Sequence, residues 1–372
     1  MESNDLKRNS TKTLYQQIRE HILDKIKRGI YKPGEAIPTE RELCKNLDVS
    51  RYTVRRAIQE LVHEGHLYRV QGSGTFVFDN TNAFEHFGSS IGVILTHCEH
   101  EMEANILSGI ENIIQEKGFR MTFVSSHDDY QREAEYIHRM RLNGVKGLII
   151  MPAEDQKESN AITDLKNEKF PFVLVDRRLQ DCETDCVMSD NIDGGYKATE
   201  YLIEIGHTKI GFVKRKYSKT SSITDRIIGY KNALKEYGIE ILPELIFSYD
   251  ENLQEEEIHS SLSKYVKNTG VTAIVAINDY VALDIIKMSR KRNIQIPEEL
   301  SLIGFDNLDF TKHLEVPLTT IAQSPKEIGE EAAKLLVEKI NNQQGNNKMA
   351  KHILTQKYFP VDLIIRESCS PR

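Results

Sequence analysis

Residues 38–77, PTERELCKNLDVSRYTVRRAIQELVHEGHLYRVQGSGTFV, decide the fold of the N-terminal part of the chain. Thr39 and, three residues later, Glu42 form the pattern of a capping box, so a short helix begins there. Ser50 is placed to cap a second helix, and Gly65 is placed to end it. The stretch therefore predicts two helices separated by a short turn.

The second helix has an apolar face and a cationic face. The apolar residues recur at the spacing of one helical stripe, at Val54, Ala57, Ile58, Leu61 and Val62. The opposite face carries Arg51, Tyr52, Arg55, Arg56 and Gln59. Arginine can donate two parallel hydrogen bonds to a guanine edge or bind a phosphate, so this face suits the major groove of DNA. By itself, the helix could equally be a solvated surface helix.

A glycine-rich hairpin is expected after the second helix. The β-prone runs 67–70 and 75–78 flank Gln71-Gly72-Ser73-Gly74. Glycines at a hairpin tip let the backbone approach a narrow groove, because no side chain stands in the way. The loop is not a dinucleotide-binding motif, since no helix follows it.

Together these residues resemble the GntR-family winged helix-turn-helix. The matching segments are Pro38 to Leu43, Val49 to Arg55, Ala57, Leu61, Glu64-Gly65 and Gln71 to Val77. The resemblance implies a DNA-binding domain over residues 10–78. A helix over 13–28, with apolar residues on one stripe, is expected to pack its core.

The resemblance also implies roles for individual residues. Arg51 and Arg55 are expected to read bases in the major groove. Tyr52 and Thr53 would touch phosphates or thymine methyl groups, and Glu40 would accept a hydrogen bond from a cytosine amino group. The remaining candidates are phosphate contacts at Arg41 and Arg56, a phosphate contact or a structural role at Tyr15, and minor-groove contacts at Gln71 and Gly72.

The composition is that of an ordinary globular protein. The 372 residues are 39% hydrophobic and 28% charged, and they leave room for two or three domains. No apolar run approaches the roughly 20 residues of a membrane span, and residues 1–12 lack the apolar core of a secretory signal. We therefore expect a cytoplasmic protein with no membrane partner.

The five cysteines are expected to be reduced thiols rather than disulfides. Cys182 and Cys186 lack the nearby Cys/His pair that a metal site would need, so no metal is expected there.

Charge is divided unevenly along the chain, whose net charge is −7. Residues 1–80 hold 14 Lys and Arg against 11 Asp and Glu, whereas the remainder holds 35 against 45. A basic head on an acidic body fits a head that binds phosphates and a body with another task.

From residue 91, short β-branched runs alternate with amphipathic helical stretches. The expected strands are 91–95, 121–125, 147–151, 172–176, 187–190, 210–213, 273–278, 301–306 and 318–323. The expected helices are 104–117, 131–142, 194–205, 225–237, 255–267, 280–292 and 326–340. The alternation predicts an α/β fold with parallel, doubly wound sheets, and the length favours two lobes. Residues 79–89 are interpreted as a linker before a domain over 90–370.

Polar side chains follow several of these strands, where ligands of doubly wound sheets bind. The strand-end residues are Asp176-Arg177, Asn278-Asp279, Asp306-Asn307 and Gln323, while Asp225-Arg226 opens a helix. Carboxylates, amides and arginines that converge on a cleft can hold a polyol through many directional hydrogen bonds. Asp225 and Asp279 could instead cap helices.

Residues 91–368 resemble the LacI/GalR regulators and their periplasmic sugar-binding relatives. The matching stretches include IGVI at 91–94, PFVLVDR at 171–177, SLIGFD at 301–306 and LTTI at 318–321. The resemblance implies effector contacts at Asp176, Ser222, Arg226, Asn278, Asp306 and Gln323, to which the strand-end argument adds Arg177. Structural roles are expected for Gly194-Gly195 in helix packing and for His207 as a helix-end cap.

One feature departs from the LacI/GalR pattern. The DNA-binding head of that family is absent, and the GntR-type head stands in its place. This pairing resembles the arabinose repressors of Gram-positive bacteria, which implies a pentose effector, L-arabinose first.

These expectations combine into a sequence-specific transcriptional regulator, and a repressor of carbohydrate utilisation genes that sugar releases from DNA is favoured. The expected partners are a second copy of the chain and a palindromic operator duplex. Another sugar, a sugar phosphate or a non-sugar effector stays open, as do activation and a tetrameric state. A sugar-transport binding protein is disfavoured by the head and by the missing signal segment. We expect neither an enzyme nor a cofactor, because no catalytic constellation or candidate pyridoxal lysine is recognisable.

Overall fold

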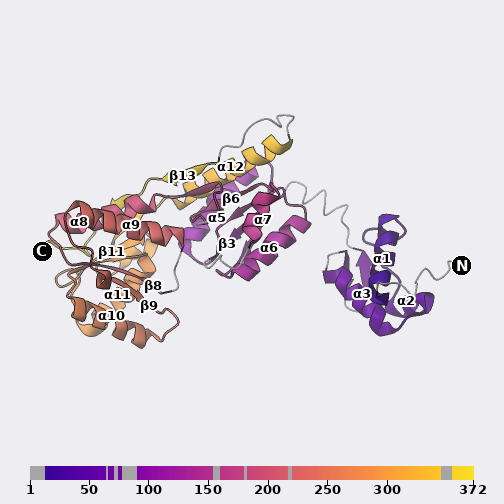
Figure 1. Cartoon of the computed structure of the whole chain (residues 1–372), viewed down its shortest axis with the longest axis horizontal. Coiled ribbons are helices and arrows are strands. Elements are labelled where there is room, and N and C mark those ends of the chain that lie inside the picture. The colour runs from indigo at the N-terminus through magenta and orange to yellow at the C-terminus, as the bar shows by residue number, and fades with distance from the viewer. Residues whose placement is uncertain are drawn as a thin grey trace. The chain divides into compact units, whose positions relative to one another are not determined.

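The computed structural model describes residues 13–63, 66–70, 74–77, 90–153, 160–179, 182–216, 220–344 and 354–372. The chain divides into two compact units, Met1–Gly88 and Ser89–Arg372 (Figure 1). The expected helix end at Gly65, the hairpin tip at 71–73 and the linker at 79–89 lie outside the described residues. Among the described helices, none is both long and apolar enough to cross a membrane.

The first unit, called the head below, is a helix-turn-helix with a β-ribbon. Its helices are α1 (Leu14–Lys27), α2 (Glu40–Leu47) and α3 (Arg51–His63), and its strands are β1 (Leu67–Val70) and β2 (Gly74–Val77). β1 pairs antiparallel with β2. One apolar core joins helices and ribbon, and it includes Ile18, Ile22, Leu43, Val54, Ile58, Leu61 and Leu67.

Both helix starts in the motif follow from the local sequence. The Glu42 amide donates to the Thr39 hydroxyl at 3.3 Å, and the Thr39 amide donates to Glu42 Oε2 at 2.8 Å, which is the expected capping box. The Thr53 amide donates to Ser50 Oγ at 3.2 Å, so Ser50 caps α3 as expected. Asp48 adopts a left-handed conformation with φ 52°, which turns the chain sharply between α2 and α3.

The second unit contains two six-stranded sheets, one in each of two lobes. The strands of the first sheet are β3 (Ser90–Leu95), β4 (Arg120–Ser125), β5 (Gly147–Ile150), β6 (Phe172–Val175), β7 (Cys186–Ser189) and β13 (Gln356–Phe359). Those of the second are β8 (Ile210–Arg215), β9 (Ile246–Tyr249), β10 (Ala273–Ala276), β11 (Ser301–Asp306), β12 (Thr319–Ala322) and β14 (Asp362–Ile364). Their spatial orders are β13-β7-β6-β5-β3-β4 and β14-β12-β11-β10-β8-β9. All described neighbours are parallel except β12 and β14.

Helices cover both faces of each sheet (Figure 1). In the first lobe, α5 (Glu101–Glu116) and α12 (Pro325–Gln344) share one apolar core, and α6 (Tyr130–Leu142) and α7 (Ala161–Asn167) share another. The second lobe packs its helices around a single large core; they are α8 (Asn191–Glu204), α9 (Ser221–Glu236), α10 (Glu255–Thr269) and α11 (Asp279–Arg292). Two short 3-10 helices also occur there, η2 (Pro243–Leu245) and η3 (Asp309–His313). The doubly wound, two-lobed α/β fold expected from the sequence is thereby confirmed.

Neither lobe is made of one continuous segment. The chain leaves the first lobe after β7, returns after β12 to form α12 and β13, and crosses again to form β14. The chain therefore crosses between the lobes three times, from β7 to α8, from β12 to α12 and from β13 to β14.

Close packing of α8 on α9 depends on glycine. A Cβ atom on Gly229 would lie 2.0 Å from the Ile192 carbonyl oxygen, and one on Gly195 would lie 2.1 Å from the Arg226 carbonyl oxygen. Since no side chain fits there, the expected role in helix packing is confirmed for Gly195, and the backbone of Arg226 is held against α8. Gly194 instead packs against the Phe305 side chain of β11, where an added Cβ atom would lie 2.6 Å from the nearest ring atom.

Several elements differ from the sequence-based expectations. Strands β9, β13 and β14 and helix α7 were not expected, and β13 in particular is short and mostly exposed, so it lacks an apolar run. Helix α9 begins at Ser221 instead of Asp225, because the polar turn Ser221-Ser222 is helical here. His207 does not cap a helix with its side chain: Nδ1 lies 2.8 Å from Thr272 Oγ1 and Nε2 lies 3.0 Å from Ser301 Oγ, next to the starts of β10 and β11.

Candidate nucleic-acid interface and ligand cavity

The exposed face of α3 carries two arginines that share one carboxylate. Arg51 Nε lies 3.3 Å from Glu40 Oε2, and Arg55 Nε lies 3.6 Å from Glu40 Oε1. The side chain of Arg51 is 75% exposed and that of Arg55 is 55% exposed. Ion pairs in such exposed positions contribute little to stability, so both guanidinium groups can exchange partners at small cost.

The other head candidates that the structure describes surround this pair. Tyr52 is exposed on the first turn of α3, and Thr53 Oγ1 lies 2.7 Å from Ser50 Oγ at the cap. The guanidinium of Arg56 stacks 4.1 Å from the centre of the Tyr15 ring, which gives Tyr15 a packing role. Arg41 is exposed on α2, whereas Gln71 and Gly72 lie outside the described residues.

A cavity of about 160 Å³ lies between the two lobes, at the carboxyl ends of the strands. Six of the seven effector candidates line it, namely Asp176, Arg177, Ser222, Arg226, Asn278 and Asp306. The seventh, Gln323, reaches the cavity wall indirectly, because its Nε2 donates to Asp306 Oδ1 at 2.6 Å.

Arg226 is the centre of a buried polar network. Its Nε donates to Asn191 Oδ1 at 2.8 Å, and its Nη1 donates to the Ile277 carbonyl oxygen at 2.6 Å. Nη2 lies 3.6 Å from Asp306 Oδ1, with both side chains less than a tenth exposed. The guanidinium also stacks 3.6 Å from the centre of the Phe305 ring. These contacts fix the orientation of the Arg226 guanidinium in the cavity wall.

Burial dominates the electrostatics of this network. Removal from water raises the pKa of the Asp306 carboxyl well above its usual value, although Arg226 acts in the opposite direction. Burial likewise raises the pKa of Asp279 to about 7, against hydrogen bonds from the Thr320 hydroxyl and the Leu308 amide. The same desolvation lowers the pKa of the Arg226 guanidinium. The cavity wall thus holds charges that are only partly compensated.

Asp176 and Arg177 stand at the end of β6 in the first lobe. Asp176 has a left-handed backbone with φ 65°, which turns its carboxylate toward the cavity. Arg177 lies 3.3 Å from Asp176 and 3.4 Å from Asp128, measured from guanidinium nitrogen to carboxylate oxygen. The next residue, Arg178, makes a bidentate pair with Asp225 on α9, with one nitrogen–oxygen distance of 2.9 Å. Asp225 therefore neither caps a helix nor lines the cavity.

Asn278 and Asp279 divide the roles that the sequence left open. Asn278 is the N-cap of α11, where its Oδ1 accepts from the Val281 amide at 2.9 Å, and it also lines the cavity. Asp279 is fully buried and accepts from Thr320 Oγ1 at 2.7 Å and from the Leu308 amide at 2.8 Å. Asp279 thus organises the loop after β11 from behind the cavity wall.

The cavity also recruits residues that sequence reasoning did not single out. They are His97, His100, Met102, Glu103, Asp128, Met151, Arg215, Thr220, Ile223, Ile277, Tyr280 and Leu308. Arg215 was missed because β8 extends two residues past the expected strand end, which brings it to the sheet edge. Its Nε is buried and has no hydrogen-bond partner among the described residues, as is also true of Gln323 Oε1. Unpaired buried polar atoms of this kind are costly unless a ligand or water completes them.

The cysteines show no pairing in the part of the chain that the structure describes. All five are free, and Cys182 and Cys186 are buried. Burial raises the pKa of the Cys186 thiol well above its usual value, which makes it an inert packing residue.

Two family models match the chain. The model for periplasmic binding proteins and the sugar-binding domain of the LacI family matches residues 88–362. The model for bacterial regulatory proteins of the gntR family matches residues 14–77.

Curated relatives match over nearly the whole length. The arabinose metabolism transcriptional repressor of Geobacillus stearothermophilus is 33% identical over 361 residues, which cover 95% of this chain and 97% of that protein. The protein of the same name from Halalkalibacterium halodurans is 32% identical and covers 96% of both chains. Both are transcriptional regulators by name.

Solved structures resemble the second unit. A LacI family transcriptional regulator from Enterococcus faecium with bound ribose is 27% identical, with a TM-score of 0.63 over 76% of this chain and 99% of that one. The transcription regulator CcpA of Lactococcus lactis is 26% identical, with a TM-score of 0.66 and the same coverage.

Proposed function

The chain belongs to the family of periplasmic binding proteins and LacI-type sugar-binding domains, joined here to a gntR-type regulatory head, and from this we propose that it represses pentose utilisation genes in response to L-arabinose. The two relatives named arabinose metabolism repressors support the choice of sugar, because they share both domains over nearly their full length. The chain is a sugar-responsive, DNA-binding repressor, and we infer that it is not an enzyme and carries no cofactor.

The single observation that carries the sugar response is the cavity wall. It combines four carboxylates with three guanidinium groups, one of which is that of Arg215 with its unpaired Nε. Carboxylates accept and guanidinium groups donate hydrogen bonds, so together they can hold several hydroxyls of a polyol. The phosphate of a sugar phosphate would add a negative charge beside the carboxylates. We assign hydroxyl contacts to Asp176, Arg177, Ser222, Arg226, Asn278 and Asp306, with Gln323 orienting Asp306.

DNA recognition is assigned to the exposed face of α3. In the proposed complex, Arg51 and Arg55 leave Glu40 for base edges in the major groove, and Glu40 accepts from a cytosine amino group. Tyr52, Thr53, Arg41 and Arg56 contact the backbone, and Gln71 and Gly72 approach the minor groove. Tyr15 supports Arg56 by stacking against its guanidinium, and its hydroxyl is assigned a phosphate contact.

Two copies of the chain act on one palindromic operator in this proposal, because two-fold protein symmetry matches two-fold DNA symmetry. Sugar between the lobes favours one lobe arrangement, and this change reduces the affinity of the paired heads for DNA. A coupling free energy of about 1–3 kcal/mol is sufficient, as is usual for allosteric proteins.

Calorimetric titration with free pentoses, hexoses and their phosphates tests the proposal. We expect L-arabinose to bind tightest and to release operator DNA in a fluorescence anisotropy assay. Ser222→Ala should weaken sugar binding about fivefold, as expected for one lost hydrogen bond. The matched control is Ser248→Ala, since Ser248 is exposed on β9 away from the cavity. Failure of every free sugar to bind the folded protein would overturn the proposed effector class.

A further inference from the structure

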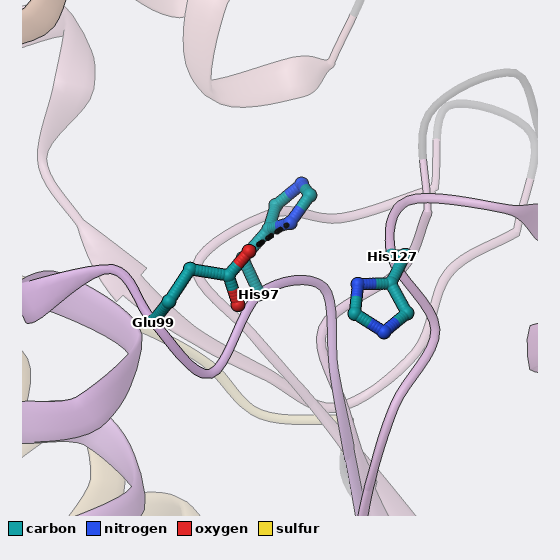
Figure 2. Close-up of side chains that lie close together, drawn as sticks. All are labelled: His97, Glu99 and His127. Carbon is teal, nitrogen blue, oxygen red and sulfur yellow. Dashed lines mark ion pairs between the residues drawn. The ribbon is translucent and has the colours of Figure 1, made fainter.

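Three side chains with metal-binding chemistry gather beside the cavity and have no role in the proposed function. They are His97 and Glu99, which follow β3, and His127, which follows β4 (Figure 2). One ligand atom from each residue lies within 4.8 Å of the other two. His97 also lines the cavity, whereas Glu99 and His127 are exposed.

The donor set is that of a zinc-class ion. Two imidazole nitrogens and one carboxylate oxygen are preferred ligands of zinc, and catalytic or exchangeable zinc sites keep a fourth position for water. With metal–ligand distances of roughly 2.0–2.1 Å, ligands of a tetrahedral ion stand about 3.3 Å apart. His97 Nδ1 and Glu99 Oε1 are already 3.5 Å apart. The ligand atom of His127 lies within 4.8 Å of both, so its ring must approach them to complete the triangle.

The backbone around these residues is firmly held. β3 and β4 are neighbouring parallel strands that pair from Ser90 with Arg120 to Leu95 with Ser125. Beyond the pairing, Ser125 Oγ donates to the Thr96 carbonyl oxygen at 2.7 Å, and the Ser126 amide donates to the Leu95 carbonyl oxygen at 2.9 Å. His127 has a left-handed backbone with φ 51°, which departs from the strand direction. Ligands on such fixed loop starts lose little freedom when an ion binds.

The neighbouring histidine is committed elsewhere. The ring of His100 lies 4.7 Å from that of His97, but its Nδ1 pairs with Glu103 Oε1 at 3.6 Å. His97, Glu99 and His127 are therefore the set to consider.

We propose that His97, Glu99 and His127 bind one divalent transition-metal ion of the zinc class, with water in the remaining position. The sequence did not suggest this site, because His97 and His127 are 30 positions apart and meet only through the pairing of β3 with β4. Zinc binding by these residues requires neither sugar nor DNA.

The site has a consequence for the cavity that rests on the proposed function. Because His97 contributes both to the metal site and to the cavity wall, an ion that fixes its ring changes the affinity for the effector. By linkage, the effector changes the affinity for the ion by the same factor. Metal availability would thus modulate the sugar response.

The first experiment titrates chelator-treated full-length protein with zinc chloride in a calorimeter, without sugar or DNA. We expect one ion per chain at this site, and binding at least about tenfold weaker in His127→Ala and in Glu99→Gln. His138→Ala is the matched control, since His138 is an exposed histidine on α6 outside the cluster. Cobalt chloride gives a second readout, because a tetrahedral cobalt ion absorbs strongly in the visible range. No zinc binding, or equal binding by His127→Ala and the parent protein, would overturn the site.

The second experiment repeats the L-arabinose titration with and without zinc chloride. A change in sugar affinity that disappears in His127→Ala supports the linkage, and an unchanged sugar affinity refutes it. The two proposals fail separately: zinc binding without any sugar binding leaves the metal site intact, and sugar binding without zinc binding leaves the proposed function intact.

Discussion

The head and the second unit, which is called the effector domain below, both pair arginine with carboxylate, but in opposite surroundings. On α3, Arg51 and Arg55 share Glu40 while their side chains are 75% and 55% exposed. Between the lobes, Arg226 faces Asp306 with both side chains less than a tenth exposed. Water screens the first set of charges and is excluded from the second.

The exposed arginines of the head can change partners, whereas the buried pair between the lobes is fixed in its position. An exposed pair is worth at most about 1 kcal/mol, so another acceptor can replace Glu40 at small cost. A buried pair is held by several hydrogen bonds. Removing one partner is costly, because the other charge is then buried without compensation. The arginines of the head can therefore exchange partners at little cost, whereas the side chains of the cavity are held in one arrangement.

The largest expected effect comes from breaking the buried pair. Arg226→Met leaves the Asp306 carboxylate without its cation, so the free energy of unfolding of the effector domain should fall by about 3–5 kcal/mol. Urea unfolding followed by circular dichroism measures this. Adding Asp306→Asn to Arg226→Met should recover much of the loss, although sugar binding should remain absent in both variants. If Arg226→Met alone were as stable as the parent protein, the loss of Arg226 would not leave an uncompensated buried charge on Asp306.

A pH effect of the next size is expected from Asp279. Its pKa is about 7 in the folded protein, against an ordinary value of 3.8, because the carboxyl is buried. The folded state then binds the proton more tightly, so this group's contribution to stability is fully present at low pH. It is lost as pH rises from about 4 to 7, by on the order of 3 kcal/mol.

Comparison with a charge-free variant isolates this contribution from other titrating groups. Asp279→Asn should lose stability less steeply than the parent between pH 5 and pH 7.5, as measured by urea midpoints. Identical pH profiles for the two proteins would argue against a raised pKa at Asp279.

A smaller effect on binding is expected from the exposed arginines. Arg55→Ala should weaken operator binding by about 1–3 kcal/mol if Arg55 reads a base, and it should leave unfolding nearly unchanged. Fluorescence anisotropy with an operator selected from random duplexes measures the affinity. Arg28→Ala is the control, because Arg28 is also exposed, at 69%, but pairs with Asp24 on α1. Equal losses of operator affinity in the two variants would mean that Arg55 contributes only its positive charge and reads no base.

The smallest effect is expected when Glu40 loses its charge. Glu40→Gln should change the stability of the head by less than about 1 kcal/mol, because the pairs it breaks are exposed on the arginine side. Thr39→Ala, one residue away, removes the cap of α2 and should cost about 1 kcal/mol or more. Hydrogen exchange of the amides in α2 and α3 compares the two. A larger loss in Glu40→Gln would mean that the shared carboxylate is structural.

The sequence predicted elements whose causes are local. The caps at Thr39 and Ser50 depend on residues within three positions, and the alternation of strands and helices follows from periodicity. Arg215 and Tyr280 could not be found this way, because their place on the cavity wall depends on where separate strands end. The partner of Asp225 is Arg178, on a loop of the other lobe, which no local pattern indicates. Strand β13 was not predicted, because it is a strand through its pairing with β7 and not through apolar character.

The order in which the chain threads the two lobes has a consequence for its synthesis. Every described element of the head precedes residue 78, whereas the sheet of the first lobe is completed by β13, at Gln356–Phe359. At roughly 5–20 residues per second, a ribosome exposes a finished head well before the ligand-binding part can close. In the nascent chain, the DNA-binding head is thus complete before the sugar-binding part that controls it.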